Sequence, residues 1–313
     1  MINRVRIMNT QKSFNNTSSQ VTSKILSPKK LNGSMLIFLA AVMWSFAGVG
    51  TKYVHWSALS VSCIRGLLAA ITIGAFNRQW IFKPNRAVLL GAVCTFATSS
   101  LFMAANKITT AANAIVLQYT APAFVIVISV IFLKVKFSKL DITTVVFIFL
   151  GISLFFIDHI GRGAFIGDLL AILSGISFAG VFFANRLPGA NAMQASYLGC
   201  LMSILLLPFL ITDPAVWAFN RVEWTAVILL GIFQLGMSYM VFSIGIRTTS
   251  ALSASIICTI EPILNPIWVF LLIGERPNVL ALIGAGVVIV TIVFYNIITV
   301  RRALNVDSAH EAT

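Results

Sequence analysis

Two ionisable side chains lie inside long apolar blocks of the sequence, where a charge is costly. Glu261 falls within the block 251–273, and Arg65 lies about seven residues into the block 59–76. Each needs a partner, a water-filled cavity or a change of protonation in such surroundings. Glu261 is a candidate proton acceptor, cation contact or gate, or else a carboxyl kept protonated or hydrogen-bonded at the adjacent proline. Arg65 is either a cavity contact or a structural anchor that reaches the end of its block or a backbone carbonyl.

Prolines near the middle of two blocks predict breaks where further polar groups gather. Pro122 and Pro262 each remove a helical hydrogen bond and crowd the carbonyl four residues earlier, and Pro266 adds a break one turn later. These are packing kinks or the walls of a solute site. The side chains predicted to line such a site are Gln118, Tyr119, Asn265, Trp44 and Tyr239. Neighbouring helices are the alternative partners of the polar groups, and bulk packing is the alternative role of the two aromatic residues.

The remaining chemistry-bearing residues argue against an enzyme. His55, His159 and His310 lie outside the block centres, and Asp158 beside His159 has no nucleophile partner. The four cysteines show no C-x-x-C spacing, so neither a metal site nor another cofactor is expected. The G-x-x-x-x-G-K-[ST] loop of ATP-hydrolysing proteins is absent, so any driving force is expected to be a gradient.

The composition predicts a membrane protein. Hydrophobic residues make up 58% of the 313 positions, charged residues 10%, and the mean hydropathy is +0.95. The apolar blocks have the 17–25 residues that a helix needs to cross about 30 Å of hydrocarbon, and their lack of alternation excludes a β-barrel. Ten spans are predicted, approximately at 34–53, 59–76, 87–105, 111–133, 140–157, 165–183, 193–211, 224–246, 251–273 and 280–300.

The net charge of +13 follows membrane topology rather than nucleic-acid binding. If both termini are cytoplasmic, 16 Lys or Arg residues lie inside and five outside, with Arg65 within a span. Residues 1–32 form a basic tail that we expect to be disordered and cytoplasmic, and residues 301–313 a cytoplasmic C-terminal tail. The expected location is the plasma (inner) membrane. An organellar membrane is the alternative, because the first residues also have the composition of a transit peptide.

An internal duplication divides the chain into residues 33–158 and 163–300. An offset of 132 aligns Ser45–Gly48 with Ser177–Gly180, and an offset of 140 aligns Phe102 with Phe242 and Pro122 with Pro262. Five spans in each half is an odd number, so the halves must be inverted with respect to each other. Inverted repeats with interrupted helices are the architecture of alternating-access carriers.

Three motifs resemble those of the EamA family of the drug/metabolite transporter superfamily. They are Trp-Ser-x-x at Trp44–Ala47, Arg-Gly-x-x-x-Ala at Arg65–Ala70, and Glu-Pro followed by Leu-Leu-Ile-Gly-Glu-Arg between Glu261 and Arg276. The resemblance covers nearly everything after residue 33. In the first half Lys134-Val135-Lys136 replaces the Gly-Glu-Arg of residues 274–276. This difference argues against a chemical requirement for that glutamate in both halves. The resemblance implies a carrier, often an exporter of amino acids, metabolites or toxic compounds, with a cavity between the halves.

The sequence therefore predicts an all-α polytopic membrane protein that carries a small organic solute. Export of amino acids or amphiphilic metabolites is the leading hypothesis, with Glu261 as the proton-coupling residue. Import of a quaternary amine or another metabolite is the alternative, and an intramembrane enzyme or a receptor is the rival from another class. The expected partners are a small-molecule substrate and the lipid bilayer, with a homodimer left open and no nucleic acid.

Overall fold

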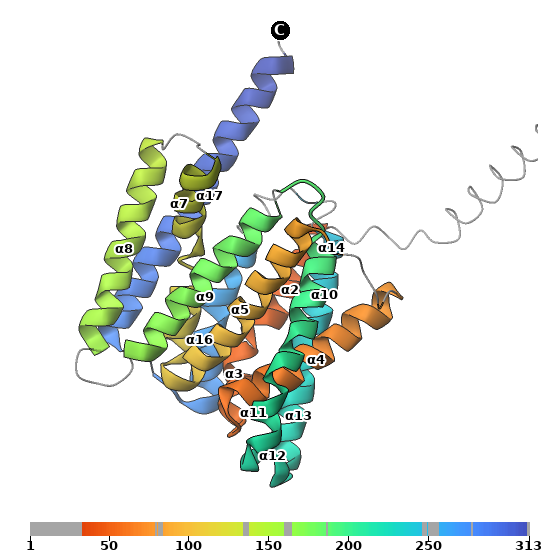
Figure 1. Cartoon of the computed structure of the whole chain (residues 1–313). Helices are drawn as coiled ribbons and strands as arrows, with labels where there is room; N and C mark the ends of the chain where they lie inside the picture. Colours follow the sequence, from red (N-terminus) through yellow and green to blue (C-terminus); the bar gives the residue numbers. More distant parts are fainter. Residues whose placement is uncertain are drawn as a thin grey trace, which may run out of the picture.

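The computed structural model describes residues 33–78, 80, 84–133, 138–159, 165–185, 187–245, 249, 257–276 and 278–311, and this part of the chain is helical without any strand. Figure 1 shows the helices as one bundle. The first half contains α2 (Gly33–Ser45), α3 (Ala47–Tyr53), α4 (Ala58–Asn77), α5 (Arg86–Ile108), α6 (Ala111–Gln118), α7 (Ala121–Leu133) and α8 (Lys139–His159). The second contains α9 (Phe165–Ala184), α10 (Ala192–Leu201), η1 (Met202–Leu206), α11 (Leu207–Thr212), α12 (Pro214–Trp217), α13 (Arg221–Leu229), η2 (Leu230–Met237), α14 (Ser238–Gly245), α16 (Ile260–Ile273) and α17 (Val279–Glu311).

The predicted all-α polytopic fold is confirmed. Eight helical segments among the described residues are long and apolar enough to cross a membrane, and α16 is a shorter apolar helix. Together with α8, which has 21 residues, they correspond to the ten predicted spans. The predicted basic tail at 1–32 lies outside the described residues, as do Lys134, Val135 and Lys136.

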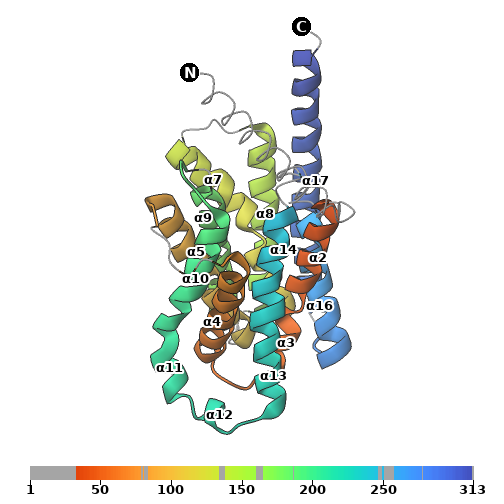
Figure 2. The ribbon, with the colours of Figure 1, turned by 90° about the vertical axis from the view of Figure 1, so that its right-hand side faces the viewer.

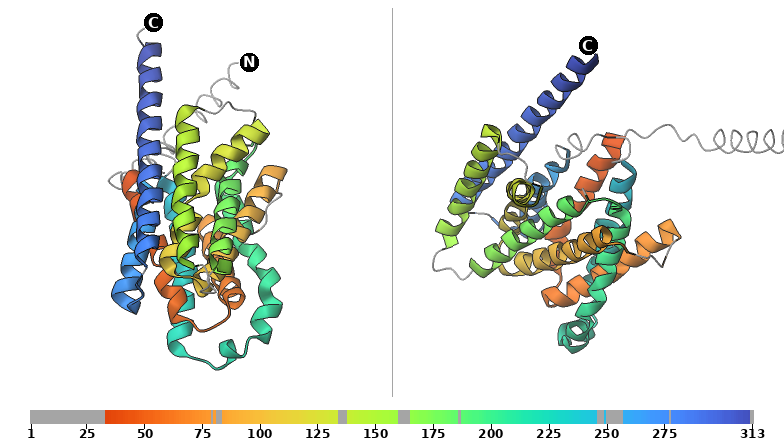
Figure 3. Two further views of the ribbon diagram at one scale, coloured as in Figure 1. Left: turned by 90° about the vertical axis from the view of Figure 1, so that its left-hand side faces the viewer. Right: turned by 45° about the horizontal axis from the view of Figure 1, so that its top comes forward.

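Packing between helices repeats between the two halves. Helix α5 of the first half lies against α9 of the second, and the pair related to it by the duplication is α14 of the second half with α2 of the first. Likewise α6 and α7 pack on α9, while α16 packs on α2 and α3. The last helices of the halves, α8 and α17, lie side by side (Figure 3). Helices related by the internal duplication therefore occupy related places in the bundle.

The two halves run in opposite directions through the bundle. In Figure 1 α2 descends and α9, its counterpart, ascends. The start of α2 and the end of α17 lie toward the same end of the molecule, which we call the terminal face (Figures 1 and 2). The opposite end, which carries α12, is the distal face.

Several spans are interrupted near their middle. A turn at Phe46 separates α2 from α3, and another at Tyr119 and Thr120 separates α6 from α7. The seventh span passes through the 3₁₀ segment η1 just before Pro208, and the eighth contains the π-helix η2. Such irregular turns are frequent at functional sites.

The structure differs from the sequence-based expectation at two helix ends. Pro266 does not end a helix, because α16 continues through it to Ile273; a proline in a membrane helix removes one donor, which neighbouring elements can replace. The last candidate span ends at Thr299, close to the predicted residue 300, but its helix α17 continues beyond it to Glu311. Residues 301–311 contain neither glycine nor proline, so nothing in that segment terminates the helix.

The close contact between α8 and α17 gives a stability prediction. A Cβ added at Gly151 would lie 2.6 Å from Cγ2 of Val288 and 3.0 Å from the carbonyl oxygen of Gly284. Gly151→Leu is therefore expected to destabilise the protein by about 1–3 kcal/mol through overpacking, measured by thermal unfolding in detergent. Gly286→Leu on the same helix pair is the control, since nothing lies within 4 Å of a Cβ at that position. Equal effects of the two variants would contradict this packing.

Candidate functional site

Arg65 lies inside the bundle and is bonded by neutral side chains of two other helices. The side chain is 3% exposed. Its Nε donates to Oε1 of Gln234 at 3.1 Å, and its Nη1 donates to Oγ of Ser99 at 3.3 Å. The partners belong to η2 and α5, so Arg65 joins three spans. Because neither partner is an acid, the guanidinium keeps its charge available for an anionic group.

Close helix contacts set the depth of Arg65. A Cβ added at Gly66 would overlap the side chain of Ser203 in η1. On the other side, a Cβ added at Gly231 in η2 would lie 2.6 Å from Cβ of Leu68. Glycine thus lets both irregular segments approach the α4 backbone closely. The π-helix that contains Gly231 also carries Gln234, the partner of Arg65.

Gln234 connects Arg65 to an aromatic group. Its Nε2 donates to the carbonyl oxygen of Trp44 at 3.1 Å, next to the turn at Phe46 where helical donors are interrupted. The Trp44 ring meets the Tyr239 ring edge-on at 5.6 Å between centroids and lies 5.3 Å from the Phe242 ring. We call Trp44, Tyr239 and Phe242 the aromatic trio. The structure therefore brings together Trp44 and Tyr239, both predicted from the sequence.

Glu261 is buried in the first turn of α16 and receives a short hydrogen bond. The hydroxyl of Tyr119 lies 2.7 Å from Oε2 of Glu261 and 3.2 Å from the carbonyl oxygen of Cys258. That carbonyl has no helical donor, because the residue four positions later is Pro262. Tyr119 lies where α6 ends in the first half, and it thus bonds the carbonyl that the proline of the second half leaves without a donor.

The phenol has one proton for two acceptors, which permits two hydrogen-bond arrangements. When Glu261 is ionised, Tyr119 donates to the carboxylate. When Glu261 is protonated, the carboxyl donates to the Tyr119 oxygen, and the phenol donates to the Cys258 carbonyl. Both arrangements use the same heavy-atom positions. The Cys258 carbonyl therefore receives the phenol proton only when Glu261 is protonated, so the hydrogen bonding at this helix break changes with the protonation of Glu261.

Arg65 and Glu261 interact electrostatically but are not one of the ion pairs that the described residues form. Each contributes to the electrostatic environment of the other, and both act on Tyr239. The ion pairs among the described residues are Lys52–Glu275 and His55–Glu223. Arg65, Glu261 and the aromatic trio therefore belong to one connected group of side chains inside the bundle. We call Arg65, Gln234, Tyr119, Glu261 and the aromatic trio the central cluster.

The other two predicted polar residues lie apart from this hydrogen-bond network. Gln118 donates from Nε2 to Oγ of Ser174 in α9 at 2.7 Å. Asn265 packs against Gly48 of α3, is 0% exposed, and finds no hydrogen-bond partner for either amide atom among the described residues. An unsatisfied buried amide costs about 1–3 kcal/mol per group. Asn265 therefore opposes stability in this conformation.

The two matched prolines free carbonyls that are treated differently. Pro122 is the second residue of α7 and provides no donor for the carbonyl of Gln118, against which Gly175 of α9 packs. Pro262 is the third residue of α16, and its freed carbonyl at Cys258 is bonded by Tyr119. The break of the second half is thus the one connected to an ionisable group.

Sequence reasoning missed three buried or hydrogen-bonded polar residues of the spans. Gln234 and Ser99 bond Arg65, and Asn106 is 0% exposed with neither amide atom bonded to any residue that the structure describes. Gln234 and Ser99 lie inside apolar blocks, which is the signal that could have identified them, and Asn106 lies just beyond the end of the block 87–105. Their number made selection by sequence alone difficult.

Comparison with known proteins identifies the family. The model of the EamA-like transporter family matches residues 31–157 and again residues 165–297. The chain belongs to the EamA-like transporter family. It is thus a multi-pass membrane protein and a transporter of small solutes.

This EamA-like chain is similar to one named protein and to one solved structure. A protein of Archaeoglobus fulgidus (strain ATCC 49558) named "Uncharacterized transporter" is 28% identical over 265 residues, which cover 82% of this chain and 93% of that protein. A crystal structure of another protein superposes with a TM-score of 0.60 at 18% identity, over 86% of this chain and 98% of its own. The latter shows the fold alone.

Polar contacts tie the helix ends of this EamA-like transporter together at the distal face. Nζ of Lys52 lies 2.9 Å from Oε2 of Glu275 and donates to the carbonyl oxygen of Thr109 at 3.1 Å. Oε1 of Glu275 accepts from the backbone N–H of Ala111 at 2.7 Å, at the N-terminus of α6 where an anion is favoured. We call Lys52, Glu275 and these backbone groups the distal lock. It joins the ends of the first and ninth spans to the start of the fourth.

A second distal contact involves Asp213 between α11 and α12. Its Oδ2 accepts from the backbone N–H of Ser57 at 2.8 Å and from Oγ of Ser60 at 2.7 Å. Burial by itself raises the pKa of Asp213, but these hydrogen bonds outweigh it and hold the pKa below its ordinary value. The contact is therefore stable at neutral pH and weakens only as the pH falls through that lowered pKa.

Asn265 provides a test that separates function from stability. Asn265→Leu is expected to leave the melting temperature unchanged or raise it, because it removes unsatisfied amide atoms, and to lower transport at least tenfold. Gln118→Leu is the control and is expected to cost about 0.5–1.5 kcal/mol, because it removes a satisfied hydrogen bond. Thermal unfolding and flux in proteoliposomes measure the two effects. Full transport by Asn265→Leu would show that the amide has no role in the cycle.

Proposed function

We propose that this EamA-like protein is a secondary transporter that exports amino acids or amphiphilic metabolites by alternating access, coupled to proton entry at Glu261. The observation that carries the proposal is the buried Tyr119–Glu261 hydrogen bond, 2.7 Å long, in the same cluster as Arg65, which has no acidic partner within the described part of the chain. A zwitterion needs one anionic and one cationic contact. Arg65 suits its carboxylate and Glu261 its ammonium group.

Proton coupling follows from competition for one carboxylate. An ionised Glu261 can bind either a proton or the ammonium group of a substrate, but not both. Proton binding from the outer side would displace the substrate, and release of that proton on the inner side would restore the binding site. Tyr119 supports both states, because its hydroxyl has Glu261 and the Cys258 carbonyl as alternative hydrogen-bond partners.

Unequal packing at the two faces supports alternating access. At the distal face α3 packs against α5 and α6. The inverted repeat relates α3 with α5 to α9 with α14, yet this second pair shows no comparable packing among the described residues. Exchanging the two arrangements between the halves would close the terminal face and open the distal one. Inverted repeats provide this exchange.

The distal lock has no counterpart in the other half of the sequence. The offset of 132 places Lys52 on Ala184, and the offset of 140 places Glu275 on Val135. An ion pair can therefore favour closure at the distal face alone. If the terminal face is cytoplasmic, as the positive charges predict, the favoured state receives substrate from the cytoplasm, which suits an exporter.

The aromatic trio supports a second candidate function, the import of a quaternary amine. The centroid of the Trp44 ring lies 5.6 Å from that of the Tyr239 ring and 5.3 Å from that of the Phe242 ring, and Glu261 acts electrostatically on Tyr239. Aromatic faces bind quaternary ammonium groups through cation–π attraction. Such a substrate carries no proton on nitrogen, so its flux would depend on Glu261 as a counter-charge.

Replacement of Glu261 tests the coupling. Proteoliposomes loaded with a mixture of the proteinogenic amino acids and with choline would be given an inward proton gradient, and efflux followed by mass spectrometry. Glu261→Gln is expected to abolish the stimulation of efflux by the gradient, because the amide cannot exchange a proton. Glu223→Gln, which alters a buried carboxyl bonded to His55 at the distal face, is expected to keep it. Unchanged, pH-dependent efflux by Glu261→Gln would refute proton coupling at this residue.

Removal of the distal lock tests the conformational part of the proposal. In a variant whose only cysteine is Cys258, the double change Lys52→Gln and Glu275→Gln is expected to increase labelling by a membrane-impermeant maleimide added at the distal side. The lost ion pair frees the distal ends to separate. Arg221→Gln, an exposed distal residue outside the lock, is the control. Identical labelling rates with and without the lock would contradict its role.

A further inference from the structure

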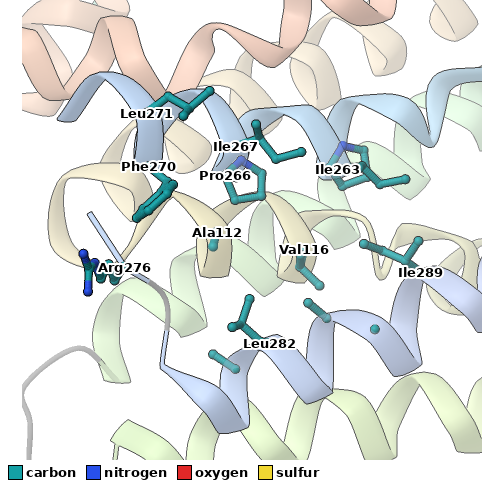
Figure 4. Close-up of a pocket in the computed structure, with 14 residues that line it drawn as sticks. Ala112, Val116, Ile263, Pro266, Ile267, Phe270, Leu271, Arg276, Leu282 and Ile289 are labelled. Carbon is teal, nitrogen blue, oxygen red and sulfur yellow. The ribbon is translucent and has the colours of Figure 1, made fainter. Parts of the chain in front are cut away.

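A groove of about 800 Å³ on the side of the bundle is separate from the hydrogen-bonded central cluster. It lies between α6, α16 and α17, and its lining is almost entirely apolar (Figure 4). One end approaches Pro262 and Val116, and the other end contains Arg276. Nothing in the proposed transport cycle requires this groove.

The groove exists because two consecutive helices do not pack against each other. The connection from α16 to α17 is short, and Gly274 adopts a positive φ of 80° at the end of α16. Such neighbours ordinarily pack as an antiparallel pair, but α17 packs mainly on α8 and also touches α6. Small residues on α17, Ala281, Ala285 and Gly286, leave the groove deep rather than filled.

The position of the groove restricts what can occupy it. Ile267 is 43% exposed, Leu271 64% and Leu282 52%, and all three belong to membrane-spanning segments or their ends. Water does not stably fill an apolar space in hydrocarbon, and an empty one loses dispersion contacts along its walls. A flexible hydrocarbon chain is the occupant that the bilayer supplies.

Arg276 places a positive charge at the distal end of the groove, so an occupant with a negative charge at that end is favoured. Its guanidinium lies 5.7 Å from the centroid of the Phe270 ring. The structure gives Arg276 no ion pair with another described residue, and the adjacent Glu275 is occupied by Lys52 and the Ala111 N–H. An arginine at membrane-interface depth suits a phosphate, which it can bind through two parallel hydrogen bonds.

We propose that the groove between α6, α16 and α17 is a binding site for an anionic phospholipid, with one acyl chain along the groove and the phosphate at Arg276. The lipid occupies the space that separates α16 from α17. It therefore supports α16, which carries Glu261 at its other end. The site is independent of the solute and of its coupling.

Native mass spectrometry of the full chain tests the proposal. Protein released from nanodiscs that contain equal amounts of phosphatidylglycerol and phosphatidylcholine with identical acyl chains is expected to retain phosphatidylglycerol. Arg276→Gln is expected to lower this preference about fivefold, the factor for one basic side chain near a membrane surface. Arg221→Gln, which removes another exposed distal arginine, is expected to leave the preference unchanged.

A second pair of variants tests the place of binding. Gly286→Leu fills the groove without a steric clash, because nothing lies within 4 Å of a Cβ there, and is expected to remove the retained lipid. Val290→Leu on the same helix, 67% exposed and outside the groove lining, is expected to retain it. Three results would overturn the proposal: equal retention of the two lipids by the wild type, an equal loss with Arg221→Gln, or unchanged retention by Gly286→Leu. A dimer that Gly286→Leu dissociates would assign the groove to a second copy instead.

Discussion

A backbone carbonyl without a donor is costly in hydrocarbon, and this constraint shapes the centre of the protein. A membrane helix satisfies its own carbonyls except where a proline removes the N–H four residues later. Pro122 and Pro262 free one carbonyl in each half, at Gln118 and Cys258. The first lies against Gly175, and the second accepts a hydrogen bond from Tyr119. The Tyr119 hydroxyl also contacts Glu261, so one side chain connects the helix break to an ionisable group.

The duplication provides two similar halves, and the differences between them matter most for transport. Tyr119 of the first half donates a hydrogen bond to the freed Cys258 carbonyl of the second half, so this bond joins the two halves. At the distal face, Lys52 and Glu275 close an ion pair for which the duplicate positions hold alanine and valine. A perfectly symmetric carrier would have equal free energy when closed at either face. A polar contact at one face alone shifts that balance.

Much of the fold followed from the sequence, because the bilayer requires long apolar helices and the internal duplication requires inversion. The predicted spans correspond to observed helices, and Tyr119 and Glu261, which lie near the two matched prolines in the sequence, contact each other in the structure. Their functional roles remain predictions. The π-helix in the eighth span and the uninterrupted passage of α16 through Pro266 were not expected. Local propensity does not decide either feature, since both depend on which neighbouring helix replaces a missing contact.

The sequence by itself determined that the protein lies in a lipid bilayer, how many spans it has and that its halves are inverted. Hydropathy and repeat length are properties of the chain alone. The tertiary structure decided which polar groups meet. Arg65 bonds Gln234 from a segment 169 residues away, and Gln118 turns to Ser174 instead of joining Glu261. These pairings depend on helix rotation and depth, which are set by close contacts such as Gly66 with Ser203. Contacts between distant spans are a consequence of packing that no local pattern encodes.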